Sequence, residues 1–217
     1  MIPLVYVWLA RLYSFEDVND PGSPVAAANG QYILIRREAY ERAGGHEAVR
    51  AQILEDVALA QRVKASGGRI LFLPGAPWVE TRMYRSFAAM WEGWTKNLYL
   101  LYGGNAKEIM GAVATIILID QLPILGLFAP AFLPRLTGPS AFLTGLYWMA
   151  LASVFVVRFE LYRRRLRELD FDPGLAVYYW LGSALFGALL LNSLCAHRAR
   201  GRIEWKGRAY STRGATG

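Results

Sequence analysis

Apolar residues are distributed unevenly along this chain of 217 residues. The first hundred positions mix apolar and polar residues at short range, whereas three long apolar runs follow, at 109–133, 141–157 and 175–195. A helix needs about 20 apolar residues to cross a bilayer. We therefore expect about three transmembrane helices within residues 105–196.

The first of these runs differs from the other two. It carries Asp120 and Gln121 near its middle, and Pro123 and Pro130 interrupt it. Proline removes a helical hydrogen bond, and an acid is costly in lipid. We expect this run to be the irregular element of the three, either spanning or re-entrant.

Basic residues follow the last two runs. Segment 158–170 (RFELYRRRLRELD) has five arginines, and 197–217 is a basic tail. Such residues gather on the cytoplasmic side of a membrane. If all three runs cross, the two basic segments lie on opposite faces, so either one run does not cross or the tail departs from the rule. We expect a multi-pass protein of the inner (cytoplasmic) membrane, with its soluble part on the cytoplasmic side.

The polar first part alternates strand-like and helix-like patterns. Residues 31–35 (QYILI) and 69–73 (RILFL) are rich in strand formers and predict two buried strands. Residues 37–43 and 54–65 have helical spacing, and a pair of glycines ends each. The order is β-α-α-β, so the expected fold is an α/β fragment followed by an α-helical transmembrane region.

Two further segments are expected at the membrane surface. Residues 1–25 predict an interfacial segment and a loop, because the apolar stretch 1–13 is too short to span and Asp, Asn, Pro and Gly gather after it. Residues 87–104 predict an amphipathic interfacial helix with an aromatic face. Residues 26–86 are left as the soluble domain.

Composition narrows the class of partner. Hydrophobic residues make up 54% of the chain, and the formal net charge is +7. A basic surplus can indicate nucleic acid, but these arginines flank apolar runs, which favours membrane lipids as partners and not nucleic acid. Cys195 is the only cysteine, and His46 and His197 lie far apart without metal-binding spacing, so the sequence predicts neither a disulfide nor a metal site.

The acidic pair Glu55 and Asp56 opens the second expected helix of the polar part. An acid in the first turn of a helix is stabilised by free backbone N–H groups and by the helix dipole, and the pattern alone favours that structural role. The functional alternative is a general base, which takes a proton from an incoming hydroxyl.

Cations and tryptophans downstream also have two interpretations. Arg85 and Lys96 suit charges that reach the headgroup level, whereas Arg82 or Lys96 can instead hold a phosphate group. Trp91 and Trp94 are typical of an interfacial belt, and a lipid or sugar acceptor stacked on Trp94 is the sharper alternative.

Five segments, in this order, resemble the C-terminal half of membrane-bound family 2 glycosyltransferases. The closest groups are the carotenoid-acid and hopanoid-associated glycosyltransferases, and the ceramide glucosyltransferases are more distant. The segments are NGQYILIRREAYERAGGH (29–46), EDVALAQRVKASG (55–67), RMY (82–84), WEGWTKN (91–97) and EWKGRAY (204–210).

This resemblance implies a GT-A fold and an inverting transfer of sugar from a nucleotide sugar to a lipid acceptor. It makes Asp56 the catalytic base, with Glu55 beside it in the same motif. Gly30 and Gln31 are then expected to line the acceptor side. The matching segments further imply substrate-binding roles for Arg82, Tyr84, Trp94 and Lys96.

One element of the resemblance is changed. The family's Q-x-x-R-W motif falls on 90–94, where Met90 replaces Gln, Gly93 replaces Arg, and only Trp94 is kept. This change argues against a processive polysaccharide synthase. It also weakens a direct diphosphate role for this helix, unless Arg82 or Lys96 substitutes.

The resemblance also implies a nucleotide-binding half with a D-x-D element that holds a divalent metal, Mg or Mn. We expect that half and those metal ligands to lie outside this chain, so that the nucleotide sugar binds only together with the N-terminal half. Asp17, Asn19 and Asp20 lie in a Pro/Gly loop without a preceding strand, and we do not expect them to hold the metal.

Two alternatives stay open from the sequence. The absent donor half and the changed motif fit a non-catalytic membrane subunit or a degenerate remnant of such an enzyme. A small transporter that uses Asp120 and Gln121 is the weaker alternative, because three spans without an internal repeat are too few.

Overall fold

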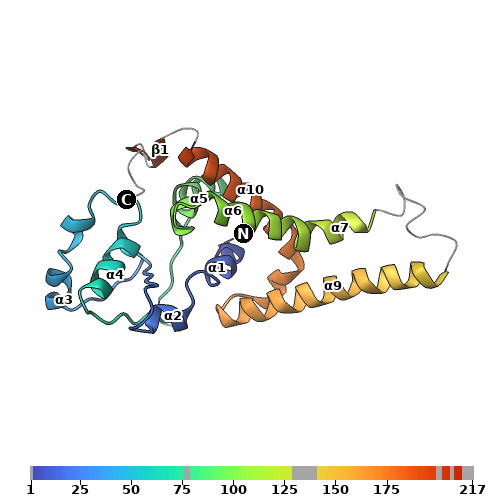
Figure 1. Ribbon diagram of the computed structural model, residues 1–217, viewed down its shortest axis with the longest axis horizontal. Helices are drawn as coiled ribbons and strands as arrows, with labels where there is room; N and C mark the ends of the chain where they lie inside the picture. Colours follow the sequence, from blue (N-terminus) through green and yellow to red (C-terminus); the bar gives the residue numbers. More distant parts are fainter. Residues whose placement is uncertain (1, 76–78, 129–140, 199–201, 206–207, 212–217) are drawn as a thin grey trace. The chain divides into compact units, whose positions relative to one another are not determined.

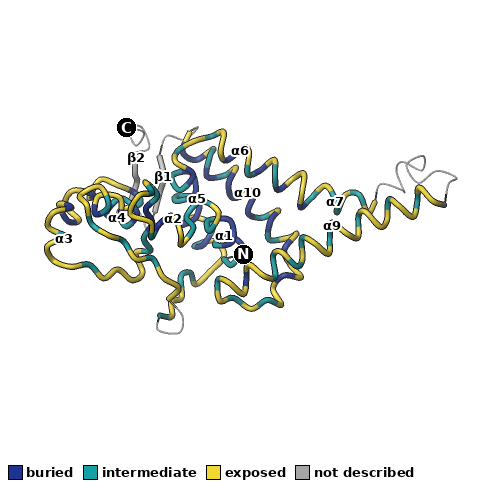
Figure 2. The backbone as a smooth tube through the Cα atoms, turned by 60° about the horizontal axis from the view of Figure 1, so that its bottom comes forward, coloured by how far each residue is buried: buried dark blue, intermediate teal, exposed yellow. Residues whose placement is uncertain are grey.

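The structure is a computed structural model that describes residues 2–75, 79–128, 141–198, 202–205 and 208–211. It divides into two units. The apolar unit comprises Met1–Val7 and Ala106–Leu191, and the polar unit comprises Trp8–Asn105 and Asn192–Gly217. Figure 1 shows the elements in sequence colours, and Figure 2 shows where the backbone is buried.

Short helices make up most of the polar unit. The chain enters it within α1 (Ile2–Leu9), and Ser14 then caps the next helix by accepting a hydrogen bond from the amide of Asp17. Ser86 caps the longest helix in the same way through the amide of Ala89. The remaining elements of this unit are α2 (Phe15–Asn19), α3 (Arg37–Arg42), η1 (His46–Val49), α4 (Glu55–Ala65), α5 (Phe87–Leu101), β1 (Arg202–Trp205) and β2 (Arg208–Ser211).

A small apolar cluster holds α3, η1 and α4 together. Its buried members are Ala43, Val49, Leu59 and Val63. Gly44 makes the sharp turn between α3 and η1 with a φ of 82°, in the left-handed region that favours glycine. The spacing of Leu59 and Val63 on one helical face confirms the sequence prediction of a helix here.

The prediction of an α/β layer from a GT-A fold is wrong. Residues 31–35 and 69–73 form no strand, and no α/β layer is present among the described residues of the polar unit. Among the described residues, the strands are β1 and β2, which form a two-stranded antiparallel hairpin that pairs Arg202 with Ser211.

Strand-forming residues at these two places lack a strand to pair with in the described part of the chain. Leu34 and Leu71 are 86% and 73% exposed, so the expected burial is also absent. At Phe72, the side chain of Asn19 makes the backbone hydrogen bonds that a neighbouring strand would make. Asn19 donates from Nδ2 to the carbonyl of Phe72 (3.0 Å) and accepts from its amide (2.6 Å). Strand propensity alone therefore does not fix a strand.

The apolar unit contains long helices. Within the described part of the chain, three stretches are long and apolar enough to cross a membrane, namely Ala106–Gly126, Phe142–Glu168 and Pro173–Arg198. The elements are α6 (Ala106–Thr115), the π-helical turn η2 (Ile116–Gln121), α7 (Leu122–Gly126), α9 (Ala141–Glu168), the 3-10 helix η4 (Pro173–Tyr178) and α10 (Tyr179–Arg198).

The expected irregularity of the first apolar run is confirmed. The π-helical turn η2 ends at Gln121, and Pro123, which has no N–H to donate, follows directly in the first turn of α7. Pro130 lies outside the described residues. The run is helical from Ala106 to Gly126, but its ladder changes register beside Asp120.

Candidate functional site

Asp56 lies in the first turn of α4 and is half-buried. Its Oδ1 accepts a hydrogen bond from the amide of Val57, and its Oδ2 accepts one from the amide of Gly30, each at 2.8 Å. A carboxylate offers about four lone-pair sites, so each oxygen keeps one for another partner. The carboxylate is thus fixed in position and can still accept a proton.

The loop before α3 presents Gly30 to this carboxylate. Asn29 organises the loop, because its carbonyl accepts from the amide of Tyr32 (3.1 Å) and its Oδ1 accepts from the amide of Gln31 (3.4 Å). Gly30 and Gln31 are exposed. A Cβ at position 30 would lie 3.3 Å from Oδ2 of Asp56, so the absence of a side chain keeps the carboxylate accessible.

Two cations on α4 fix this helix against the rest of the polar unit. Arg62 donates from Nε to the carbonyl of Ala43 (2.6 Å). Lys64 donates from Nζ to the carbonyls of Asp17 (3.3 Å), Val18 (3.1 Å) and Val25 (2.6 Å). No local sequence pattern predicts these contacts, because they join residues far apart in the chain. They anchor the helix that carries Asp56.

Glu55, the other member of the acidic pair, is exposed at the start of α4. Among the described residues, no hydrogen bond or ion pair fixes its carboxylate in the way that two amides fix Asp56. Of the two acids, Asp56 is thus the one whose carboxylate is held by backbone amides, and Glu55 has the geometry of an acid at a helix start.

Tyr84 packs against α5 at Gly93. A Cβ at position 93 would lie 2.5 Å from the tyrosine hydroxyl, so a larger residue does not fit there without movement of the ring. This contact gives a physical reason for glycine where the resembled motif has arginine. Arg82 is exposed in the extended segment before α5, and Tyr84 is half-buried.

The α5 helix holds Trp94 and Lys96 in different surroundings. Trp94 is buried, with 4% of its surface exposed, and Lys96 is half-buried. In this arrangement the indole is buried and is not exposed as a stacking surface. The predicted site residues therefore fall into two groups, one around Asp56 with Gly30, and one on or just before α5.

Buried polar contacts brace α5, and sequence reasoning missed them. The hydroxyl of Ser193 donates to the carbonyl of Thr95 (2.7 Å) and accepts from the amide of Tyr99 (2.9 Å). These two groups are four residues apart and would otherwise pair within the helix, so Ser193 is inserted into the ladder of α5. Asn192 adds a hydrogen bond from Nδ2 to Oγ1 of Thr95 (2.8 Å).

The end of α5 is also tied to the start of the polar unit. The hydroxyl of Tyr13 donates to the carbonyl of Leu101 at 2.8 Å. Burial raises the pKa of Tyr13, which keeps the phenol protonated as a donor. This contact fixes the C-terminal turn of α5.

No metal centre is assembled in the described part of the chain. No group of three or more His, Cys, Asp or Glu side chains there is arranged to hold an ion. In the 14–22 loop the polar side chains serve the local backbone: Asp17 accepts from the hydroxyl of Ser14 (2.6 Å), and Asp20 accepts from the amide of Gly22 (2.8 Å). These residues do not fit the Mg or Mn that the resemblance implies.

Comparisons with known proteins agree with the resemblance seen in the sequence. Residues 23–216 match the model of a family described as glycosyl transferase family 21. The chain is 28% identical over 193 residues to the 4,4'-diaponeurosporenoate glycosyltransferases of Staphylococcus aureus strains USA300, NCTC 8325 and MRSA252. The match covers 88% of this chain and 49% of each relative, so the chain spans about half the length of these relatives. No solved structure matches it.

Proposed function

Because the chain belongs to glycosyl transferase family 21, we propose that it takes part in sugar transfer from a nucleotide sugar to a lipid acceptor at the membrane surface, and that it supplies the acceptor-activating base. The observation that carries the proposal is the fixed carboxylate of Asp56 at the start of α4, beside the open Gly30 loop. The relatives, by their name, transfer sugar to 4,4'-diaponeurosporenoate, which supports a lipid-like acceptor.

In the proposed reaction, Oδ1 or Oδ2 of Asp56 takes the proton of the acceptor's hydroxyl or carboxyl group. The acceptor oxygen forms a bond to the anomeric carbon as the bond from that carbon to the nucleotide phosphate breaks. The bonding electrons leave with the phosphate, and the configuration at the anomeric carbon inverts. General base catalysis of this kind contributes about 10²- to 10⁴-fold to rate.

Other residues have secondary roles in the proposal. Gln31, exposed beside Gly30, lines the acceptor side. Arg82 is an exposed cation before α5 that can neutralise a phosphate group, and Tyr84 before α5 and Lys96 on it are assigned to substrate binding with it. The donor nucleotide and the Mg or Mn are assigned to a nucleotide-binding half, and no step described here is routed through a metal.

The membrane assignment of the proposal follows from the apolar helices. Three stretches long and apolar enough to span support an integral membrane protein. We place the polar unit on the cytoplasmic side of the inner membrane, because basic residues at the ends of apolar helices favour that side.

The test measures sugar transfer in membranes, from radiolabelled nucleotide sugar into extracted lipid. The protein is the chain joined to a nucleotide-sugar-binding half, compared with its Asp56→Asn variant. The matched control is Glu38→Gln, which neutralises an exposed acid in the first turn of α3. We expect a loss of about 10²- to 10⁴-fold for Asp56→Asn and little change for the control. Unimpaired transfer by Asp56→Asn would remove the base assignment and favour a non-catalytic subunit.

A further inference from the structure

Contacts within the apolar unit fix the direction of α9 relative to the first apolar helix. Arg158 on α9 forms an ion pair with Asp120, and Tyr147 on α9 donates to the carbonyl of Gly126. The contact partners run from Gly126 back to Asp120 as α9 runs from Tyr147 on to Arg158. The α9 helix is thus antiparallel to the first apolar helix. The arginine-rich end of α9 therefore extends toward the end of the unit where α6 begins.

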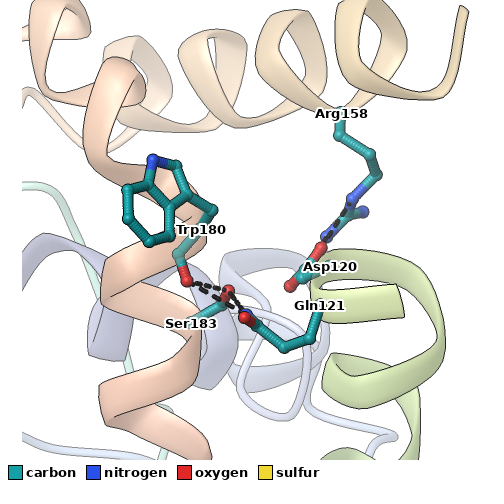
Figure 3. A network of polar contacts seen from close by, with 5 residues as sticks. All are labelled: Asp120, Gln121, Arg158, Trp180 and Ser183. Atoms are coloured by element: carbon teal, nitrogen blue, oxygen red, sulfur yellow. Dashed lines mark hydrogen bonds and ion pairs between the residues drawn. The ribbon is translucent and has the colours of Figure 1, made fainter. Parts of the chain in front are cut away.

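The direction of α10 follows from a second set of contacts. Nε2 of Gln121 donates to the carbonyl of Trp180 (3.0 Å) and to Oγ of Ser183 (2.9 Å), as Figure 3 shows. Further along α10, a Cβ at position 187 would lie 3.6 Å from Cγ2 of Ile116. The α10 helix is therefore antiparallel to η2. Hence α10, like α9, runs toward the start of α6.

The helices α9 and α10 are consecutive and run in the same direction, so the chain between them must run back along α9. The η4 helix makes this return. Ala176 of η4 packs with Leu166 in one buried cluster, and the ring of Tyr179 lies 6.3 Å from that of Tyr162. The η4 helix is therefore antiparallel to α9. The chain leaves the end of α9 and folds back along it (Figure 1). It then starts α10 at the level of Gln121, whose Nε2 donates to the carbonyl of Trp180.

A turn at this level is physically acceptable where polar groups beside it have partners. In lipid, each unsatisfied backbone group costs several kcal/mol. At the start of α10, the carbonyl of Trp180 accepts from both Gln121 and Ser183, and Arg158 neutralises Asp120. Figure 3 shows these side chains converging from three helices.

From these directions we propose that only α6–α7 and α9 cross the membrane, and that η4 with α10 forms a re-entrant element. It enters from the face where α9 ends and returns to that same face. The arginines of 163–167 and the basic tail 197–217 then lie on one face, which makes that face the contact surface for anionic lipid headgroups of a single leaflet. Both basic segments satisfy the charge rule for membrane proteins, which three crossings would violate.

The proposal is tested by labelling single cysteines in membrane vesicles. Cys195, the only cysteine, is replaced by serine in the full chain. Cysteines are then introduced one at a time as Arg167→Cys at the exposed end of α9, Ala215→Cys in the tail, and Ser140→Cys between the first two apolar runs. A membrane-impermeant maleimide is applied to right-side-out and inside-out vesicles, and labelling after detergent solubilisation shows that each thiol reacts.

We expect Arg167→Cys and Ala215→Cys to be labelled in the same vesicle orientation, and Ser140→Cys in the opposite one. Labelling of positions 167 and 215 from opposite sides would show that α10 crosses and would overturn the proposal. Labelling of all three positions from one side would show that α9 does not cross the membrane, and would also overturn the proposal. The outcome is independent of the assignment of Asp56, since none of the three positions belongs to the proposed base or its loop.

Discussion

The backbone amide of Gly30 is hydrogen-bonded to Oδ2 of Asp56, 26 residues further along the chain, with the nitrogen and oxygen 2.8 Å apart. This contact joins a loop to the first turn of α4. It means that the position of a carboxylate depends on a residue without a side chain. The first prediction concerns this pair.

Replacing Gly30 with alanine should displace the carboxylate of Asp56. The new Cβ would stand 3.3 Å from Oδ2, closer than ordinary contact, so the carboxylate or the loop must shift. A displacement of about 1 Å can cost about 100-fold in rate, so a shift of a few tenths of an ångström should cost on the order of tenfold. The measurement is the turnover rate for sugar transfer by the complete enzyme. The control, Gly145→Ala on α9, meets no atom within 4 Å and should keep wild-type turnover.

Replacing Asn19 with alanine should destabilise the polar unit. It removes both hydrogen bonds to the backbone of Phe72 and leaves that amide and carbonyl without the side chain that pairs them. We expect a loss of about 1–3 kcal/mol, read as a lower midpoint of thermal unfolding in detergent. Gln61→Ala, on the exposed face of α4, is the control and should leave the midpoint unchanged. An equal midpoint for Asn19→Ala would show that the extended segment does not depend on this side chain.

Removing one partner of the Asp120–Arg158 pair should be more damaging than removing both. The side chain of Asp120 is 2% exposed and that of Arg158 is 20% exposed, so either single replacement by leucine leaves a charge largely buried. We expect each single variant to lose about 3–5 kcal/mol. The double variant Asp120→Leu with Arg158→Leu should recover most of that loss, as measured by thermal unfolding. A double variant with the sum of both losses would contradict the pairing.

Replacing Ser193 with alanine should weaken the attachment of α10 to α5. Ser193 is fully buried, and its hydroxyl bridges the carbonyl of Thr95 and the amide of Tyr99. We expect a cost of about 1–2 kcal/mol, because the two backbone groups lose a partner that the helix replaces only by tightening its ladder. Ser153→Ala is a matched control, since that serine also bonds a backbone carbonyl but is exposed on α9. Equal unfolding midpoints for the two variants would argue against the inserted geometry.

Helices were predictable from the sequence because their signals are local. The apolar spacing of Leu59 and Val63 and the glycines after Ala65 located α4, and the aromatic face located α5. Such patterns depend on residues three or four apart, which the chain order displays directly. The break near Asp120 was also visible, from an acid and a proline inside an apolar run.

The strands were not predictable because a strand is completed by a distant partner. The apolar residues at 31–35 and 69–73 have the right composition, but pairing decides the outcome. At the candidate site, the resemblance named both Gly30 and Asp56, and the structure brings them into contact. It did not name Lys64, Asn19 or Ser193, whose contacts run from a side chain to backbone groups 39 to 98 residues away and leave no local pattern.

The π-helical turn η2 has a consequence for any change in chain length within Ile116–Gln121. Such a turn is equivalent to one extra residue in an α-helix, and each residue rotates a helix by about 100°. A deletion of one residue there would keep the helix continuous and apolar. It would nevertheless turn α7 away from α9, and it would aim Asp120 and Gln121 at hydrocarbon instead of at Arg158 and Ser183.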